Sequence, residues 1–584
     1  MIPILPVRTL SSSPDLEAQQ KRKRQQGKGR QTDPVVLVQV RALLGEASRQ
    51  KDLLIEHLHK INDHIGFLPI PYLVALAQEM GLAQTEVFEV ASFYHHFEVR
   101  DENAAQTHIT RLRVCDSLSC EMAGANALIA QLKIDFPATS LQIERVPCIG
   151  RCEQAPAACL EQHTLAACSS EQVGRALAEK KLAAQITAYT DYAHYQAAGG
   201  YQQLRACHDG QIAREELFKL MEDSGLRGLG GAGFPAGRKW RLVAKESGPR
   251  LMAVNIDEGE PGTFKDRVYL EASPHTFLEG MLIAAWAVDI AEIYIYLRDE
   301  YHGCRAILET ELEKIRQSPP VPNLPRIHLR RGAGAYICGE ESAMIESIEG
   351  KRGLPRLRPP YVAQVGLFNR PTLEHNFETL YWVPQLMQKG AAWFQEQGRH
   401  GRHGLRSFSV SGRVNKPGVH LAPAGITLEE LIHEYAGGMQ EGHTLYAYLP
   451  GGASGGILPA SMANIPLDFD TLQAYGCFIG SAAIIVLSQF DRAIDAARNT
   501  MAFFKHESCG QCTPCRSGTA KALDLIQTPQ WDIPLLKELS NVMRDASICG
   551  LGQAAPNPID CVIQYFPHEL ELVDDQKNAM EQAQ

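Results

Sequence analysis

The sequence has no uninterrupted apolar run of the ~18 to 20 residues that a membrane-spanning helix needs. Residues 277–297 come closest, and Glu279, Asp289 and Glu292 interrupt them. The N-terminus lacks the apolar core of a signal peptide, and the net charge of −10 gives no reason to expect binding to nucleic acid. We therefore expect a cytoplasmic protein that binds neither a membrane nor a nucleic acid.

A P-loop of the form G-x-x-x-x-G-K-S/T is absent as well. A different glycine-rich stretch occupies residues 225–240. Its residues Gly228, Gly230 and Gly233 fit the pattern G-x-G-x-x-G, but a Rossmann site needs a strand directly before that pattern. Residues 214–223 have helical spacing instead, so we expect a nucleotide site of another kind.

The composition of this glycine loop suits an anionic ligand. Its backbone N–H groups lead into a helix, and Arg238 and Lys239 add cationic donors. Phe234 and Trp240 are candidates for stacking on a planar ring. The alternative is a flexible surface loop without a ligand.

Fifteen cysteines are many for a protein expected in a reducing compartment, where clustered cysteines more often bind metal than form disulfides. Two pairs each follow a β-rich segment, and a helical segment separates them: Cys115 and Cys120, then Cys148 and Cys152. Four thiolates at the ends of adjacent strands suit a [2Fe-2S] cluster. A four-cysteine zinc site and unrelated buried cysteines are the alternatives.

The most specific motif is the C-x2-C-x2-C run of Cys509, Cys512 and Cys515 in the helical C-terminal region. Such a run binds one corner of a [4Fe-4S] cluster, which needs a fourth thiolate from elsewhere. Cys549 is the expected fourth ligand, and Cys561 is a less favoured substitute.

An α/β region follows the glycine loop, with strands expected at residues 250–255, 293–297 and 327–331. The first strand runs into a loop that holds Asp257, Glu258 and Glu260. Loops after the carboxyl ends of strands are where α/β folds bind ligands, and carboxylates there accept hydrogen bonds from ring nitrogens and ribose hydroxyls. A hydrophilic turn is the plainer interpretation.

A second glycine-bearing loop, residues 332–342, follows the third strand and leads into a helical stretch. Glu340 and Glu341 stand at the start of that helix, where its dipole favours anions. Helix capping alone would also explain these two residues.

Together these elements resemble the flavin-containing, NADH-oxidising subunit of respiratory complex I and its relatives in NAD-linked hydrogenases and formate dehydrogenases. The first part resembles the small thioredoxin-like [2Fe-2S] subunit, here joined ahead of the flavin subunit in one chain. The resemblance implies an α/β multidomain protein. Composition and residue spacing, together with this resemblance, predict a disordered basic tail (1–33), a helical bundle (34–106), a thioredoxin-like [2Fe-2S] domain (107–183), a Rossmann-like FMN- and NAD-binding domain (184–406, opening with a connector at 184–210), a β-grasp-like module (407–490) and a helical [4Fe-4S] domain (491–584).

The resemblance also implies roles for individual residues. Glu260 would line the nicotinamide side of the site as the catalytic residue. The residues expected to bind FMN or NAD are Gly228, Gly230, Gly231, Gly233, Phe234, Lys239, Asn255, Asp257, Glu258, Tyr336, Gly339, Glu340, Glu341, Asn376 and Thr379. Three positions depart from complex I: His375 replaces an asparagine, and Leu242 and Tyr361 replace phenylalanines that help to hold the adenine.

The implied function is that of a diaphorase subunit, which passes electrons between iron-sulfur clusters and NAD through FMN. Overall likeness, as in residues 296–301, 366–372 and 449–462, favours the β subunit of NAD-dependent formate dehydrogenase. Its expected partner is a molybdenum- or tungsten-containing catalytic α subunit with its own iron-sulfur clusters. A diaphorase subunit of an NAD-reducing hydrogenase or of a complex I-like dehydrogenase is the alternative, and a non-catalytic cluster-binding assembly module is an alternative of another class.

Overall fold

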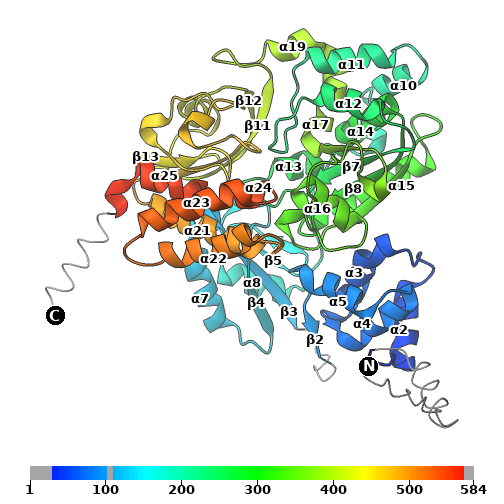
Figure 1. Cartoon of the computed structure of the whole chain (residues 1–584), viewed down its shortest axis with the longest axis horizontal. Helices are drawn as coiled ribbons and strands as arrows, with labels where there is room; N and C mark the ends of the chain where they lie inside the picture. Colours follow the sequence, from blue (N-terminus) through cyan, green and yellow to red (C-terminus); the bar gives the residue numbers. More distant parts are fainter. Residues whose placement is uncertain (1–28, 102–108, 571–584) are drawn as a thin grey trace, which may run out of the picture. The chain divides into compact units, whose positions relative to one another are not determined.

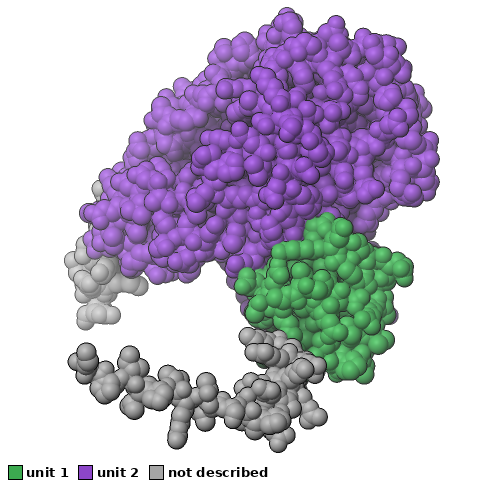
Figure 2. Space-filling view, turned by 45° about the vertical axis from the view of Figure 1, so that its right-hand side comes forward, with its two compact units in different colours: residues 1–92, 97–106 green, residues 93–96, 107–584 purple. Residues whose placement is uncertain are grey.

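The computed structural model describes residues 29–101 and 109–570, in two compact units that Figure 2 shows in different colours. The smaller unit comprises residues 1–92 and 97–106, and the larger comprises residues 93–96 and 107–584. Most of the predicted basic tail, residues 1–28, lies outside the described residues, as do residues 571–584 of the predicted C-terminal domain.

The smaller unit is mainly helical, as the apolar spacing predicts. Asp33 caps the first helix by accepting the N–H of Val35, and Gly66 and Gly81 end the next two long helices in the left-handed conformation. The elements are α2 (Pro34–Leu44), α3 (Leu54–Ile65), β1 (Leu68–Pro69), α4 (Ile70–Met80), α5 (Gln84–Phe93) and β2 (Val99–Arg100). The parallel pair of β1 and β2 was not predicted.

The larger unit begins with a four-stranded sheet of order β4-β3-β5-β6. Its elements are β3 (Thr110–Cys115), α6 (Leu118–Met122), α7 (Ala125–Asp135), β4 (Leu141–Val146), β5 (Ala158–Leu160), β6 (His163–Leu165) and α8 (Ser170–Ala178). β3 and β4 pair in parallel, so their carboxyl ends lie side by side. Leu112, Ile129 and Val173 lie in the core between this sheet and its helices.

Residues 184–210 are not the plain connector that the sequence suggested. They include α9 (Tyr192–Ala197) and α10 (Gln202–His208), and α10 packs against α14 (Pro274–Val288). Glu279 of α14 accepts hydrogen bonds from the Tyr195 hydroxyl and from the backbone N–H of Tyr201. These buried contacts give the segment an ordered structure despite its Ala-Ala-Gly-Gly sequence.

The central sheet is fully parallel and has the order β10-β7-β8-β9. Figure 1 labels its two middle strands, β7 and β8. The three predicted strands are present as β7 (Arg250–Ile256), β8 (Ile290–Leu297) and β9 (Arg326–Arg331), and β10 (Thr372–Asn376) was missed. Register aligns Asn376 of β10 with Asn255 of β7. The surrounding helices are α11 (Arg214–Asp223), α12 (Ala236–Ala244), α13 (Lys265–Ala272), α14, α15 (His302–Gln317), α16 (Glu341–Ile348), α17 (Phe377–Tyr381), α18 (Val383–Lys389) and α19 (Ala391–Gln395).

A mixed five-stranded sheet of order β12-β11-β15-β13-β14 follows. It consists of β11 (Leu405–Gly412), β12 (Gly418–Pro423), β13 (Leu445–Leu449), β14 (Leu458–Pro459) and β15 (Ala483–Ser488), with α20 (Leu428–Glu430) between β12 and β13. The chain then forms the predicted helical region, α21 (Ala493–Glu507), α22 (Thr513–Ile526), α23 (Ile533–Ala546), α24 (Gly550–Ala554) and α25 (Asn557–Tyr565). The predicted multidomain α/β class is confirmed. None of the helices in residues 29–101 and 109–570 has both the length and the apolar character of a membrane span.

Candidate functional site

Two adjoining cavities open where the carboxyl ends of β7 and β10 meet the glycine loop. The first has a volume of about 310 Å³ and the second of about 600 Å³. Both are lined by Gly230, Ala232, Asn255, Gly339, Glu340 and Asn376. The cavities therefore share one wall, which suits two ligands, or two parts of one ligand, in contact.

The glycine loop forms this shared wall because hydrogen bonds fix its backbone in place. The Leu229 N–H donates to Thr379 Oγ1 at 3.0 Å, and the Gly228 N–H donates to the Phe234 carbonyl at 2.8 Å. A Cβ on Gly230 would lie only 2.9 Å from the Cβ of Asn376. Thr379 thus contacts the loop and is not among the residues that line either cavity, although the sequence placed it at the ligand.

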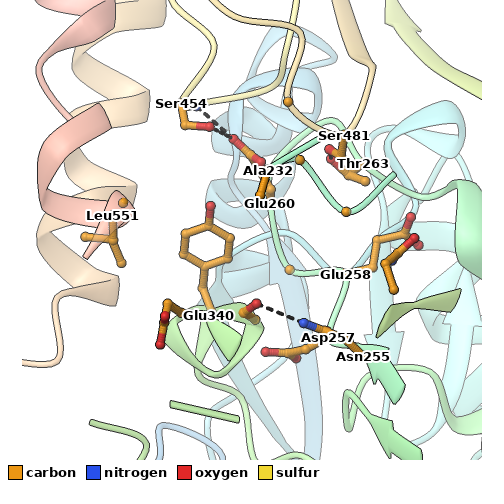
Figure 3. A pocket seen from close by; sticks show the side chains of 18 of the residues that line it. Ala232, Asn255, Asp257, Glu258, Glu260, Thr263, Glu340, Ser454, Ser481 and Leu551 are labelled. Atoms are coloured by element: carbon orange, nitrogen blue, oxygen red, sulfur yellow. Dashed lines mark hydrogen bonds between the residues drawn. The ribbon is translucent and has the colours of Figure 1, made fainter. Parts of the chain in front are cut away.

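Carboxylates crowd the first cavity, as the loop after β7 predicted (Figure 3). Oδ2 of Asp257 is buried without a hydrogen-bond partner among the described residues, and burial raises its pKa well above the ordinary value. A ligand N–H directed at Asp257 would satisfy this oxygen, and the heteroaromatic ring of FMN carries such a group. The residues present fit the flavin.

Glu258 and Glu260 differ in their hydrogen bonds. Glu258 accepts the N–H groups of Asp266 and Arg267, so its carboxylate satisfies the free N–H groups in the first turn of α13. Glu260 accepts the N–H of Ser454 at 2.8 Å (Figure 3), and burial raises its pKa from near 4.5 to about 7. Glu260 is thus a carboxyl that changes charge near neutral pH beside the cavity.

The second glycine-bearing loop leads into α16, and Glu340 and Glu341 stand at the start of this helix as expected. Glu340 caps this helix by accepting the N–H groups of Ser342 and Ala343. Arg358 forms ion pairs with both Glu340 and Glu341. Tyr336 and Gly339 line the first cavity, and Asn255 Nδ2 donates to the Gly339 carbonyl at 2.9 Å.

The second cavity is lined by the other residues that the resemblance predicts to contact the nucleotide. Phe234 and Lys239 line it, with Gly228 and Gly233, and Lys239 Nζ lies 3.2 Å from Glu374 Oε2. Leu242 and Tyr361, the two departures from complex I, line the same cavity and are exposed. Trp240 is fully buried, so the expectation that it stacks on a ligand ring is wrong.

Several lining residues had not been predicted from the sequence. Lys265 is buried and lies 2.6 Å from Asp266 Oδ1 and 2.9 Å from Glu378 Oε2. Its position directly after the acidic loop, in Pro-Gly-Thr-Phe-Lys, was an available signal. Ser454, Phe478 and Ser481 line the first cavity from the five-stranded module, some 200 residues farther along the chain. Ser454 lies in a glycine-rich stretch, Pro-Gly-Gly-Ala-Ser-Gly-Gly, which by itself predicts only a turn.

The first four cysteines come together at the carboxyl ends of β3 and β4. Cys115 ends β3, and its thiol has those of Cys120 and Cys148 as hydrogen-bonding neighbours. Cys148 Sγ lies 3.3 Å from Cys152 Sγ. All four are buried. Four buried sulfurs in one place fit a [2Fe-2S] cluster, as the spacing indicated.

The second set of cysteines gathers at the amino ends of α22 and α24. Cys512 precedes α22, Cys515 lies in its first turn, and Cys549 precedes α24. Burial raises the pKa of Cys515 to about 11 and that of Cys549 to about 12, so metal binding must displace their protons. The Cys509 thiol lies close enough to that of Cys549 to influence it electrostatically, and the set fits a [4Fe-4S] cluster.

Cys561, the less favoured fourth ligand, lies next to a cysteine outside this set. Its Sγ lies 3.5 Å from Cys477 Sγ, and both side chains are buried. This pairing supports Cys549 over Cys561 as the fourth ligand.

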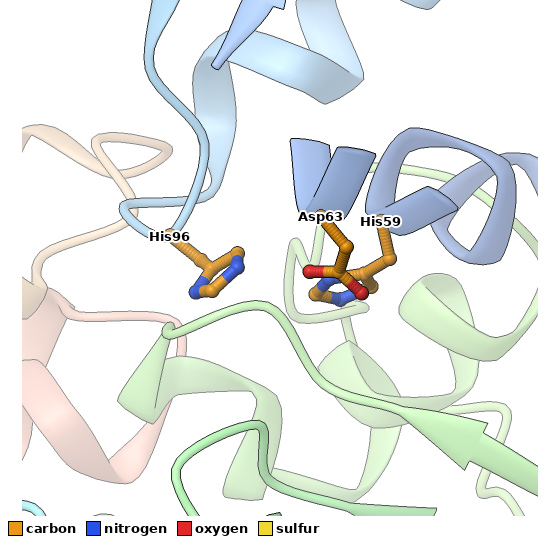
Figure 4. A group of neighbouring side chains, drawn as sticks. All are labelled: His59, Asp63 and His96. Atoms are coloured by element: carbon orange, nitrogen blue, oxygen red, sulfur yellow. The ribbon is translucent and has the colours of Figure 1, made fainter. Parts of the chain in front are cut away.

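The smaller unit presents a histidine and a carboxylate on one helix. His59 and Asp63 lie one turn apart on α3 and point to the same side (Figure 4). Figure 4 also draws His96, which belongs to the larger unit. Two ligand atoms are fewer than the three protein ligands of catalytic zinc sites, so we assign no metal to α3.

Three protein families match successive parts of the chain. Residues 40–181 match the thioredoxin-like [2Fe-2S] ferredoxin family, residues 221–385 match the Nuo51 FMN-binding domain, and residues 495–572 match the iron-sulfur binding region of NADH-ubiquinone oxidoreductase F. The chain therefore contains an FMN-binding domain and binding regions for a [2Fe-2S] and a [4Fe-4S] cluster.

Individual relatives agree with these matches. The F 2 subunit of NADH-quinone oxidoreductase in Rhizobium meliloti is 40% identical over 390 residues, which is 64% of this chain and 92% of the relative. The F subunit of the same enzyme in Rickettsia felis is 40% identical over 373 residues, 61% of this chain and 88% of the relative. The crystal structure of an NAD+-reducing [NiFe]-hydrogenase in the H2-reduced state has a chain that superposes with a TM-score of 0.78 at 30% identity, covering 90% of this chain and 94% of that chain. The chain belongs to the family of the flavin-binding F subunit of NADH-quinone oxidoreductase, with a thioredoxin-like [2Fe-2S] ferredoxin fused ahead of it.

Proposed function

We propose that this chain is a diaphorase subunit that passes electrons between NAD(H) and its iron-sulfur clusters through FMN. One observation carries the proposal: the first cavity is lined at once by the glycine loop, by the acidic loop after β7 and by Gly550 and Leu551, which follow Cys549 directly. A flavin in this cavity would thus border the [4Fe-4S] ligands on one side and the second cavity on the other.

Each part of the site has a distinct task in this proposal. Asn255, Asp257, Glu258 and Asn376 hold FMN, with Tyr336, Gly339 and the glycines of the loop, while Thr379 keeps the loop in place. Phe234 and Lys239 hold the nucleotide in the second cavity with Glu341. Glu260 lines the first cavity and faces the nicotinamide side from there. FMN supplies exchange of two electrons with the nicotinamide and of single electrons with the clusters.

We propose further that the chain is the β subunit of an NAD-dependent formate dehydrogenase, located in the cytoplasm. Its partner would be a molybdenum- or tungsten-containing α subunit that oxidises formate to CO2, and electrons would pass through the [4Fe-4S] centre and FMN to reduce NAD+ to NADH. The [2Fe-2S] centre would be a side branch. Likeness in residues 296–301, 366–372 and 449–462 supports this partner.

A hydrogenase partner is the second candidate, and the similarity to a chain of an NAD+-reducing [NiFe]-hydrogenase favours it. The chemistry within this chain is the same in both cases. A third candidate, a cluster-binding assembly module without turnover, would bind the clusters but leave the flavin unreduced by NADH.

Anaerobic purification with NADH titration tests the proposal. We expect bound FMN, about six irons for one cluster of each type, and rapid bleaching of the flavin absorbance on addition of NADH. Intact clusters and flavin without bleaching would contradict the diaphorase function. Co-purified subunits are then assayed for NAD+ reduction with formate and with H2, since activity with one donor alone decides between the two partners.

A further inference from the structure

The [2Fe-2S] ligand loop lies directly against the acidic loop after β7, and Arg298 joins the two. Arg298 follows β8 and is buried. Its Nη2 donates to the Cys148 carbonyl at 2.7 Å, and its Nη1 donates to the Glu258 carbonyl. A single guanidinium thus holds the backbone of a cluster cysteine and the backbone of a residue that lines the first cavity.

Other contacts fix the same two loops against each other. Arg267 Nε donates to the Gly150 carbonyl at 2.9 Å, and the Tyr301 hydroxyl donates to Glu258 Oε2 at 2.8 Å. Gly150 has a φ of +70°, and a Cβ there would overlap the Tyr301 ring. The cysteine loop therefore has little freedom to move independently of the cavity wall.

The charge on Arg298 is permanent. A guanidinium does not lose its proton in proteins. Glu300 supplies a counter-charge, since its Oε2 lies 3.1 Å from Arg298 Nε. A fixed cation beside an iron-sulfur cluster stabilises the form that carries one more electron.

We propose that Arg298 is a positioning residue that raises the reduction potential of the [2Fe-2S] centre and makes it respond to what occupies the first cavity. This inference rests on the proposed cluster ligands and diaphorase function. A ligand that moves the Glu258 backbone changes the hydrogen bond to Arg298, and the other end of the same guanidinium then changes the field at Cys148.

Three variants of the full chain, purified with its partners, separate charge from hydrogen bonding. Both clusters are titrated potentiometrically with dithionite and followed by EPR, with and without FMN. In R298Q we expect the [2Fe-2S] potential to fall and no longer to shift on FMN binding. The variant E300Q keeps Arg298 but removes the negative charge of Glu300, so we expect the [2Fe-2S] potential to rise. In R298K we expect a [2Fe-2S] potential close to that of the parent protein, because the positive charge remains. The FMN-dependent shift should disappear, because one ammonium cannot hold both carbonyls as a planar guanidinium does.

The [4Fe-4S] centre is the internal control, and its potential should shift less than that of the [2Fe-2S] centre in all three variants, since Arg298 contacts the backbone of Cys148 directly and reaches the second cysteine set only through the neighbourhood of Glu507. R298Q protein with full iron content and an unchanged [2Fe-2S] potential would overturn the inference. If R298Q does not fold, the inference is overturned when the [2Fe-2S] potential of E300Q equals that of the parent protein. Failure of NADH to bleach the flavin would count against the proposed function alone, because dithionite titration does not depend on NADH.

Discussion

Trp240 Nε1 donates a hydrogen bond of 2.8 Å to Nε2 of His375, and both side chains are buried. Because Nε2 accepts this bond, the proton of the neutral imidazole resides on Nδ1. Burial lowers the pKa of His375 well below its usual range, so the ring stays neutral at physiological pH. The glycine-loop helix α12 is thereby tied to β10.

Replacing Trp240 by phenylalanine removes this donor and leaves a buried acceptor unpaired. We expect W240F to be less stable by about 1–3 kcal/mol, measured by urea unfolding. W393F, which truncates a less buried tryptophan, is the matched control. Equal stability of W240F and the parent protein would show that the hydrogen bond contributes nothing.

Glu260 predicts a specific dependence of stability on pH. In the unfolded chain its carboxyl loses the proton near pH 4.5, whereas in the folded chain it keeps the proton until about pH 7. The folded state therefore binds more protons in this interval, and the free energy of unfolding falls as pH rises through it. E260Q has no carboxyl at this position and so avoids this fall in stability. We expect its free energy of unfolding to exceed that of the parent protein by almost nothing at pH 4.5 and by at most about 3 kcal/mol at pH 8. Parallel pH curves for E260Q and the parent would refute the shift, and E396Q, at an exposed site, should show no such advantage.

The cysteine sets predict iron content. C549S should lose the [4Fe-4S] cluster, and about four irons with it, while C561S should keep all irons. Iron and sulfide analysis with EPR measures both. The opposite result would make Cys561 the ligand and would require its separation from Cys477.

A methyl group on the glycine loop should expel the flavin. The Cβ of G230A would press on Asn376, so we expect loss of most of the FMN, measured by fluorescence after acid release. G248A places its Cβ where no atom lies within 4 Å and should retain FMN fully. Full retention by G230A would place the flavin away from this wall.

Lys239 should matter for the nucleotide and not for the flavin. K239M removes a cation from the second cavity, and we expect its KM for NADH to rise about tenfold, equivalent to about 1.4 kcal/mol, at unchanged FMN content. Lys245, exposed at the end of the same helix, offers the control K245M. A similar KM in both variants would exclude contact between Lys239 and the nucleotide.

The sequence was most informative where the chemistry is local. The cysteine spacings predicted two sets of cysteines that the structure brings together, because the members of each set are a few residues apart or lie at the ends of neighbouring elements. The strands β7, β8 and β9 were predicted from their apolar runs. β10 was missed because Thr-Leu-Glu-His-Asn is short and polar, and only its pairing with β7 makes it a strand.

Prediction failed where a residue's role depends on distant partners. Trp240 looked like a stacking ring in the sequence, and His375, 135 residues away, makes it a buried donor. Ser454 contacts Glu260 across 194 residues, and no pattern of spacing reports such a contact. Likewise α10 is ordered by Glu279 of a later helix and not by its own sequence.

The alignment of Asn376 with Asn255 also bears on assembly of the protein. These two residues lie on the last and first strands of the central sheet in sequence order, so the wall they share does not exist until the whole segment from β7 to β10 has been made and folded. In the proposed function FMN binds at this wall, so we expect it to bind only after the sheet is complete. Uptake of FMN would then report that this sheet has formed, and we expect a chain that stops folding earlier to release no flavin on acid treatment.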